Sequence, residues 1–588
     1  MNKLAVFVGI VLLVLAVFYG KHEWTKNSRE LFRRKLETVH NTLDDIKEHA
    51  KEFNVKEIVK VSDSIYMGIG FALANSIMII APEGVVIVDV TESYEAAAEI
   101  LTEFRKITKK PITDIVYTHS HPDHTYGAKA FIEDPSKPPR VWAHESITKG
   151  FGQYFYGPNQ AHYARSMRQF GVFLPDHLSS GIGISLRYGD GSSTLAIKYP
   201  DTFIKGDWED AVLAGLPLRF VHIPGETDDQ IGVWIPSEKA FLCADDLYKA
   251  FPNLYAIRGT TSRELMQWVR SIDKIIDLQP TMLVPSHTRA VIGHAEVATL
   301  LTEYRDAIQF VHDQTIRLIN YGYTADEIGN MLKLPAQLAK NPYLREFYGT
   351  VKWSAKSVFT YYEGWFSGDP VDLDPLTRGE RADRMVELID KDGILDAAKK
   401  ALKNEDFQWA LELASFVART DPENKQANDL RVEALIELGS RQLSNNGRNY
   451  YLTSAMEIAS GLKLTSPSAA KLALISEFPL EYPLSAFPTI FRADECETRN
   501  ETVYFNFQDP VSHHYVRFRN GVVIIRHEVP HNWDIKVSSS VSSWKQILTG
   551  ESSAVVMLAT GEISIEGGIL AFKSFMGCFD RDIKYTNF

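Results

Sequence analysis

The segment Thr118-His119-Ser120-His121-Pro122-Asp123-His124 decides the fold of this 588-residue chain. It ends the apolar run Ile112–Thr118, which is typical of a buried strand. If the segment starts extended, the side chains of His119 and His121 project to the same side, and Asp123 and His124 follow on a turn. Imidazoles and a carboxylate on one loop suit zinc, iron or manganese. Histidine is rare here, with 17 in the chain, so the cluster indicates a metal site rather than a chance surface group.

Short apolar runs and amphipathic segments alternate around this motif. A helix is expected at Ser93–Lys106. Strands are expected at Asn75–Ala81, Val85–Val90, Leu218–Ile223, Ile231–Ile235, Phe241–Ala244 and Met282–Val284. This mixture predicts a layered α/β domain with a site at strand ends. One loop cannot complete the ligand shells of two metals, so further ligands are expected later in the chain.

In the second half of the chain the predicted secondary structure changes twice, first to helices and then to short strands with one helix. From residue 296 to 475 the pattern is almost wholly helical, and Asp406–Gly439 is similar to one tetratricopeptide unit of about 34 residues. A single unit cannot stack alone, so we expect it to pack on neighbouring helices or on a second subunit. Residues 476–588 begin with a proline-containing linker and continue with short strands and a helical patch at Trp544–Leu548. They predict a small α+β domain.

The N-terminus carries an uncharged apolar run, Leu4–Gly20, at the lower length limit for spanning a bilayer. A cleaved signal peptide prefers a shorter apolar core and a small-residue cleavage site, so an uncleaved single-pass anchor at 1–27 is favoured and a secreted protein is the alternative. Residues 28–60 are charged and predict a juxtamembrane helical segment. Basic residues after the run favour a cytosolic body, whereas Asn500-Glu501-Thr502 is a glycosylation sequon. The side of the membrane stays open.

Charge and cysteine content exclude some classes of function. The net charge is −12, which argues against a nucleic-acid partner, because such partners usually need a basic face. There are three cysteines, and no pair has metal-ligand spacing. Cys496 and Cys578 could pair, but unpaired thiols are the favoured expectation.

Further pieces follow the histidine motif in the order found in the metallo-β-lactamase superfamily, which this chain resembles. They are Val88-Asp89, Pro224-Gly225-Glu226, Ala244-Asp245 and Pro285-Ser286-His287. The resemblance implies an αββα sandwich at residues 61–295, in which Asp89 orders the site through hydrogen bonds. It implies one metal held by His119, His121 and Glu226, a second held by Asp123, His124 and His287, and Asp245 bridging the two.

The implied cofactor is two Zn²⁺ per subunit. A water or hydroxide between the metals is the expected nucleophile, because a bound cation lowers the pKa of water. Asp123 and Asp245 are therefore also predicted to be catalytic. Three carboxylates against two divalent metals leave about one net positive charge, which favours hydroxide and an anionic substrate.

The glutamate at position 226, where many relatives have histidine, is similar to the alkylsulfatase family. In that family the glutamate comes one residue later, after Pro-Gly-Thr. The segment Gly364–Pro370 resembles the one that opens the family's helical dimerisation domain, assigned here to 296–475. The segments 544–550 and 561–567 resemble sterol carrier proteins, and that domain is assigned to 476–588. The resemblance implies a homodimer that cleaves small amphiphilic anions, namely linear primary alkyl sulfate esters such as dodecyl sulfate.

The run 253–259, Asn-Leu-Tyr-Ala-Ile-Arg-Gly, is similar to an alkylsulfatase run whose arginine binds sulfate. Arginine offers a bidentate fork for such anions, so Arg258 is the predicted sulfate ligand, with Asn253 and Tyr156 beside it. The family has two histidines just upstream, where this chain has Lys249 and Pro252, and Lys249 is expected to supply a cation instead. This departure keeps two alternatives open: hydrolysis of a thioester, lactone or phosphodiester, or a lipid-binding protein with a vestigial metal site.

Overall fold

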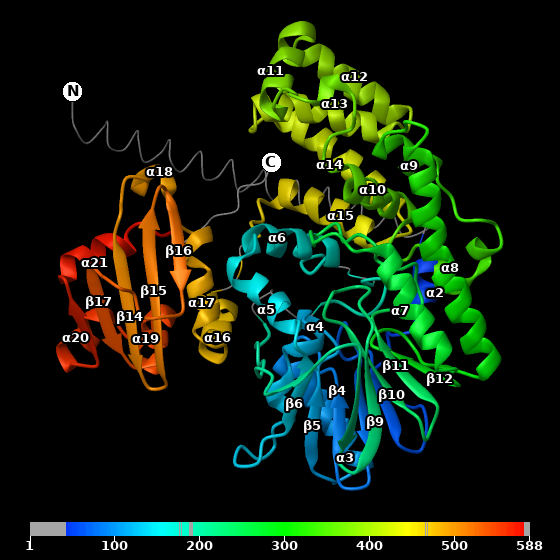
Figure 1. Cartoon of the computed structure of the whole chain (residues 1–588). Helices are drawn as coiled ribbons and strands as arrows, with labels where there is room; N and C mark the ends of the chain where they lie inside the picture. Colours follow the sequence, from blue (N-terminus) through cyan, green and yellow to red (C-terminus); the bar gives the residue numbers. More distant parts are fainter. Residues whose placement is uncertain are drawn as a thin grey trace, which may run out of the picture.

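The chain folds into a two-sheet region, a helical region and a region with one further sheet (Figure 1). The structure, a computed structural model, describes residues 43–580 except 176, 178, 187–191, 465 and 467. In Figure 1 the two sheets lie at the bottom, the helical region lies above them, and the third region stands beside both. This order confirms the predicted fold class.

The first sheet has seven strands in the order β1-β2-β3-β4-β5-β6-β7. Strands β1 to β4 pair antiparallel, and β4 to β7 pair parallel. The strands are β1 (Glu57–Lys60), β2 (Ile65–Ile69), β3 (Ser76–Ile80), β4 (Val85–Val88), β5 (Ile112–Val116), β6 (Arg140–His144) and β7 (Thr202–Ile204).

The second sheet has six strands in the order β13-β12-β11-β10-β9-β8. It is antiparallel except for the pair β11 and β12, which run parallel. The strands are β8 (Trp208–Leu213), β9 (Leu216–His222), β10 (Ile231–Ile235), β11 (Ala240–Ala244), β12 (Met282–Pro285) and β13 (Val291–Ile292).

The side chains of strand β4 show that the two sheets pack face to face and that helices cover the outer face of the first sheet. Its side chains alternate: Val86 and Val88 pack between the two sheets, whereas Val85 and Ile87 pack on the outer face of the first sheet. A strand that is covered on both faces reads as a continuous apolar run, as this one does. Helices α3 (Tyr94–Ile107) and α5 (Ile147–Tyr156) cover the first sheet, and α7 (Leu265–Asp277) and α8 (His294–Ile319) cover the second. The result is an αββα sandwich.

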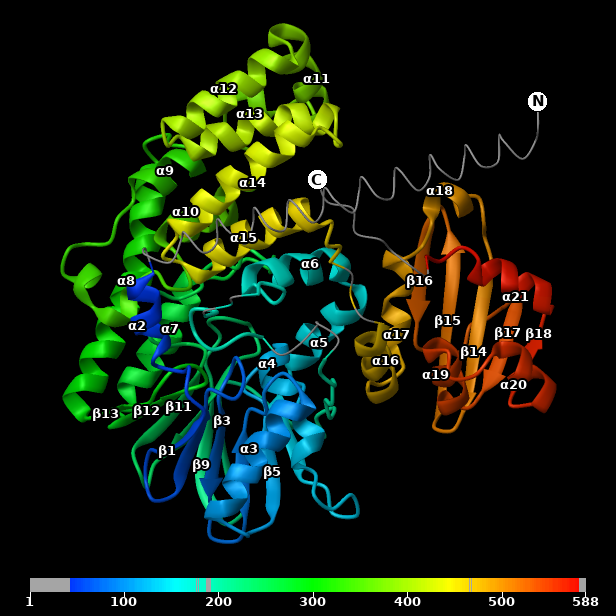
Figure 2. The ribbon, with the colours of Figure 1, turned by 180° about the vertical axis from the view of Figure 1, so that it is seen from behind.

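The segment predicted as a juxtamembrane helix at 28–60 differs from that prediction in its described part. It holds a short helix, α2 (Asp44–Ala50), and the edge strand β1. Figure 2 shows α2 on the near side of the molecule, and Ile46 of α2 belongs to a core cluster with Tyr163 and Phe347. The end of this segment therefore belongs to the sandwich, because β1 pairs with β2 over its whole length.

The prediction of a membrane anchor is contradicted by the lengths and apolar content of the helices in the described part of the chain. Among the described residues, no helix is both long enough and apolar enough to cross a bilayer. Helix α8 has 26 residues but carries charged side chains throughout. The finding overturns the predicted transmembrane helix, membrane partner and membrane location. The run Leu4–Gly20, to which those predictions referred, lies outside the described residues.

The helical region packs successive helices against one another. The predicted tetratricopeptide-like unit consists of α13 and α14, which pack on α12 and α15 respectively. The longer helices here are α10 (Val351–Glu363), α11 (Arg378–Ile389), α12 (Lys391–Lys403), α13 (Phe407–Thr420), α14 (Lys425–Ser440) and α15 (Asn445–Ser460). Short helices α6 (Asn159–Phe170) and α9 (Ala325–Met331) contact α15 and α10.

The third region has a five-stranded sheet in the order β16-β15-β14-β17-β18. Its strands are β14 (Thr502–Gln508), β15 (Val511–Arg519), β16 (Val522–Arg526), β17 (Ile535–Ser539) and β18 (Ile563–Glu566). Helices α19 (Val541–Thr549), α20 (Ala554–Thr560) and α21 (Ile569–Met576) contribute to the core on one face of the sheet. Helices α16 (Ser468–Glu477) and α17 (Glu481–Ser485) connect it to the rest of the chain.

The expectation of unpaired thiols at Cys496 and Cys578 is wrong. The two residues form a disulfide, although 82 positions separate them in sequence. Cys496 ends helix α18 (Ala493–Cys496), and the fold returns the chain after α21 to the same place, where Arg492 N donates to the Cys578 carbonyl at 2.9 Å. Cys243 is a free and buried thiol.

Candidate metal centre

Four strand ends meet at one edge of the sandwich and carry the predicted site. Strands β4 and β5 are parallel neighbours in the first sheet, and β11 and β12 are parallel neighbours in the second, so each pair ends on the same side. Asp89 follows β4, and Asp245 follows β11. The backbone turns sharply at both ends, with positive φ at Asp89 (59°) and Ala244 (51°). Left-handed backbone at non-glycine residues is uncommon and clusters at functional sites.

The predicted metal ligands form two groups at this edge. His119, His121 and Asp245 form one, and Asp123, His124 and His287 form the other, with the ligand atoms of each group within 4.8 Å of one another. Asp245 lies between the groups: its Oδ2 is 3.9 Å from His119 Nε2, 3.5 Å from His124 Nε2 and 3.2 Å from His287 Nε2. This is where a bridging carboxylate would stand.

Several buried nitrogen and oxygen atoms at the site have no hydrogen-bond partner, and a bound metal ion would interact with them. His124 Nε2, His287 Nε2, Asp245 Oδ1 and Glu226 Oε2 are buried and make no hydrogen bond. Buried polar atoms in folded proteins almost always have a hydrogen-bond partner. Four such atoms without one around a single point therefore indicate a site for a ligand. Imidazole nitrogens and carboxylate oxygens are the donors that divalent transition metals prefer. The residues present therefore fit metal binding at this edge of the sandwich.

The two histidines of the first group, His119 and His121, are held in the neutral form that binds metals. Burial, followed by the neighbouring charges, lowers the pKa of His119 and His121 well below the usual histidine value. A neutral imidazole is the form that binds metals, so these rings are ready to act as ligands near neutral pH.

Hydrogen bonds from residues behind the predicted metal ligands fix the orientation of those ligands. Asp89 Oδ2 accepts from His124 Nδ1 at 2.7 Å and from Ser286 Oγ at 2.7 Å, and the main-chain and side-chain donors of Thr118 also bind the carboxylate at 2.9 Å each. His287 Nδ1 donates to the Leu73 carbonyl at 3.0 Å. Because Nδ1 of both rings is occupied, Nε2 is the nitrogen that faces the centre, which is the usual arrangement behind metal-binding histidines.

Glu226 occupies a different position from the other predicted ligands. Its Oε1 lies 3.9 Å from His121 Nδ1, but the same oxygen accepts from Arg263 Nη2 at 2.9 Å. Arg263 was not predicted from the sequence. It stands in a loop without periodic pattern, and its partner is 37 residues away, so no local signal identifies it.

Arg258 and Asn253 lie beside the metal ligands. Arg258 Nη2 is 3.4 Å from His121 Nε2, and its Nη1 is buried without a partner. Asn253 is fully buried, and neither atom of its side-chain amide has a partner, whereas its main-chain N–H binds the Tyr248 hydroxyl at 2.8 Å. Unpaired donors next to a cationic centre form a site for an anion.

Tyr156 and Lys249 lie apart from this centre. The Tyr156 hydroxyl points back along α5 to the Lys149 carbonyl at 3.4 Å, and Tyr156 is 38% exposed. Lys249 Nζ pairs with Glu52 Oε1 at 2.5 Å. Tyr154, two residues before Tyr156, instead donates to the carbonyl of Ser120, between the ligands His119 and His121.

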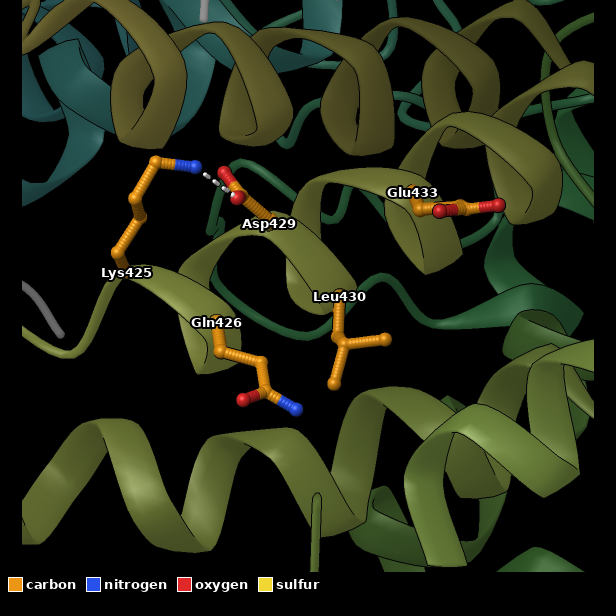
Figure 3. A pocket seen from close by; sticks show the side chains of 5 residues that line it. All are labelled: Lys425, Gln426, Asp429, Leu430 and Glu433. Atoms are coloured by element: carbon orange, nitrogen blue, oxygen red, sulfur yellow. Dashed lines mark hydrogen bonds and ion pairs between the residues drawn. The ribbon is translucent and has the colours of Figure 1, made fainter. Parts of the chain in front are cut away.

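A surface depression on α14 offers no comparable chemistry (Figure 3). It is lined by Lys425, Gln426, Asp429, Leu430 and Glu433. Lys425 and Asp429 neutralise each other at 2.5 Å, and both Lys425 and Gln426 are exposed. The strand-end centre is therefore the better candidate for a catalytic site.

Comparison with known proteins covers most of the chain. Family models described as metallo-beta-lactamase superfamily, alkyl sulfatase dimerisation and alkyl sulfatase C-terminal match residues 69–287, 324–461 and 470–584. A linear primary-alkylsulfatase from a Pseudomonas species is 36% identical over 527 residues, covering 86% of this chain and 98% of that protein. An alkyl/aryl-sulfatase of Saccharomyces cerevisiae is 27% identical, covering 92% of this chain and 86% of that protein.

Solved structures agree with the sequence comparison. The stereoselective inverting sec-alkylsulfatase Pisa1 from a Pseudomonas species superposes with a TM-score of 0.85 at 25% identity, covering 92% of this chain and 87% of that one. A double mutant of the same enzyme gives a TM-score of 0.87 at 26% identity, covering 94% and 90%. The similarity therefore includes all the regions described above.

Proposed function

This chain belongs to the alkylsulfatase family of the metallo-β-lactamase superfamily, and from that premise we propose that it hydrolyses linear primary alkyl sulfate esters such as dodecyl sulfate. The observation that carries the proposal is the convergence of two metal-ligand groups with the unpaired donors of Arg258. The 36% identity to a linear primary-alkylsulfatase supports the choice of substrate class. A lipid-binding protein with a vestigial site is disfavoured, because six of the seven predicted ligands lie together in two groups that could hold a metal.

The proposed cofactor is a pair of Zn²⁺ ions. His119 and His121 with Glu226 would hold one, His124 and His287 with Asp123 would hold the other, and Asp245 would bridge them. When bound, the ions act as Lewis acids and make water a nucleophile near neutral pH.

The residues of the chain then bind the ester and orient the reaction. Arg258 Nη1 and the amide of Asn253 hold the sulfate oxygens, because both are buried and have no other partner. Asp245, whose Oδ1 is left unpaired for an ion, would hold in place the metals that activate the attacking water. Burial keeps bulk water from competing for these groups, which strengthens each charge-assisted hydrogen bond.

The proposal is tested by assaying the purified protein on dodecyl sulfate while measuring its metal content. We expect inorganic sulfate to be released, full loss of turnover after chelation, and recovery on adding Zn²⁺. Asp123→Ala should lose metal and activity together. Full activity in a metal-free Asp123→Ala protein would overturn the proposal.

A substrate panel separates the alternative ester from the proposed one. Dodecyl sulfate, dodecyl phosphate and a dodecanoyl thioester share one alkyl chain and differ in the group that Arg258 would contact. We expect kcat/KM to be highest for the sulfate. A higher value for the phosphate or thioester would assign the site to that ester instead.

We also infer a homodimer formed through an exposed apolar surface of the helical region. The surface lies around the end of α10 and on α11, within the part matched by the alkyl sulfatase dimerisation model. It consists of Tyr361, Tyr362, Trp365, Val371, Leu373, Leu388 and Ile389, and we call it the Trp365 surface. Large apolar side chains that are exposed in such number over a short stretch of chain favour a protein interface.

A further inference from the structure

Arg263 is a buried arginine that touches two parts of the site at once. It lies immediately before α7 and is 5% exposed, although arginine is rarely buried without a specific partner. Its Nη2 donates to Glu226 Oε1 at 2.9 Å, and its Nη1 donates to the main-chain carbonyl of Asn253. One guanidinium therefore links a candidate metal ligand to the run that carries Asn253 and Arg258.

The contact with Arg263 makes the two oxygens of Glu226 unequal. Oε1 is held by the guanidinium, whereas Oε2 is buried and has no partner. The side chains of this pair are 2% and 3% exposed, so solvent does not weaken the interaction. A planar guanidinium also fixes the direction of the carboxylate that it binds. The Glu226 carboxylate is thus fixed in direction, with Oε1 beside Arg263 and His121 and with Oε2 unpaired.

We propose that Arg263 is a positioning residue for the metal centre. It fixes the direction of the Glu226 carboxylate beside His121, with Oε2 left free to bind an ion, and it anchors the Asn253 backbone to the same carboxylate. The proposal rests on the proposed metal centre but is independent of which ester is cleaved. It differs from a purely structural ion pair, because it predicts a change in the metal's surroundings when Arg263 is altered.

The test compares Arg263→Gln, Arg263→Lys and a matched control, Arg270→Gln. Arg270 lies seven residues later, and its pair with Glu264 is exposed, so removing it tests the general effect of deleting an arginine near α7. Each protein is stripped of metal and reloaded with Zn²⁺ or Co²⁺. The readouts are metal ions per subunit in competition with a chelating dye, and the absorption spectrum of the Co²⁺ protein.

We expect Arg263→Gln to weaken one of the two metal sites by about 10- to 100-fold, the usual effect of removing a group that orients a ligand. Its Co²⁺ spectrum should change, and Arg263→Lys should restore part of the affinity because one cationic donor remains. Arg270→Gln should match the parent in both readouts.

Unchanged metal affinity and an unchanged Co²⁺ spectrum in Arg263→Gln would overturn the proposal. If that variant does not fold, Arg263→Lys decides, because lysine cannot hold Glu226 and Asn253 in the same fork. A parental spectrum and affinity in Arg263→Lys would then overturn it. Failure of the proposed function would look different: normal metal binding in the parent with no release of sulfate from dodecyl sulfate.

Discussion

Asp89 is the residue on which the hydrogen bonds behind the metal ligands converge. It accepts from His124, Ser286 and both donors of Thr118, and it is fully buried. We predict that Asp89→Asn lowers metal affinity or kcat/KM by about 10- to 100-fold, because an amide cannot accept from all these donors. Metal content and dodecyl sulfate turnover check this. The exposed Asp134→Asn is the control, and equal values for the two variants would contradict the prediction.

Arg258 and Lys249 give opposite predictions for substrate binding. Arg258→Lys removes the planar fork, and a charged hydrogen bond is worth about 1.5–3 kcal/mol, so KM for dodecyl sulfate should rise roughly 10- to 100-fold with metal content unchanged. Lys249→Ala should leave KM within about twofold, because a partly exposed pair such as Lys249 with Glu52 contributes little. Steady-state kinetics of the two variants decide; a larger effect from Lys249→Ala would reverse the assignment.

At this scale, sequence reasoning predicts residues that carry their own chemistry in a local pattern. The histidine motif is such a case, whereas Asp245 and His287 were predicted from the family resemblance. Sequence reasoning did not predict Arg263 or Tyr154. Neither residue stands in a recognisable pattern, and only the fold brings Arg263 to Glu226 and Tyr154 to the Ser120 carbonyl. Lys249 was expected at the site because it stands where the alkylsulfatase family has a histidine, and its partner Glu52 is 197 positions away.

Helix α2 provides a test of pH dependence at the scale of an element. Its His49 stacks on Phe347 with ring centroids 3.9 Å apart, and its Nε2 donates to the Gly181 carbonyl at 2.8 Å. Burial, the largest cause, lowers the pKa of His49 to about 4. Because the folded pKa lies below the unfolded value, the stability contributed by neutral His49 is complete above about pH 6.5 and is lost as pH falls towards 4.

We therefore predict that part of the loss of stability between pH 7 and pH 4.5 disappears in His49→Gln. The maximum contribution is about 3 kcal/mol for a shift of this size. Urea unfolding at several pH values measures it, with the exposed His294→Gln as control. Parallel pH profiles for the parent and His49→Gln would contradict the role of this ring.

The predicted strands also show what an apolar pattern can reveal about elements. Runs such as Val85–Val90 are long enough and apolar enough to stand out, and β4 occupies their first part. Strand β8 does not stand out, because its sequence WEDAVL mixes charged and apolar residues at an exposed sheet edge. Strand β1 has only four half-exposed residues and was absorbed into a predicted helix. Edge strands are short and polar in natural proteins, so their patterns are weak.

At the scale of the whole molecule, contacts between distant segments fix the arrangement. Phe478 of the linker packs its ring 5.1 Å from Phe151 of α5, and Tyr199 OH lies 3.0 Å from Tyr482 OH. These contacts join the third region to the sandwich. Neither they nor the Cys496–Cys578 disulfide follow from local sequence, because each pairs segments 82 or more positions apart. The succession of a layered α/β domain, helices and an α+β region was predictable, since each has its own periodicity.

The Trp365 surface determines the assembly that we infer for the molecule. Trp365 is 74% exposed and Leu388 is 78% exposed, which is costly for large apolar side chains in water unless a partner covers them. We predict that Trp365→Glu together with Leu388→Glu converts the dimer to a monomer, because burying two unpaired carboxylates opposes association. Light scattering coupled to size-exclusion chromatography measures the mass. Val511→Glu is the control, because Val511 of strand β15 in the third region is 74% exposed, and this variant should remain dimeric. A double variant that keeps the dimer mass would place the subunit interface elsewhere.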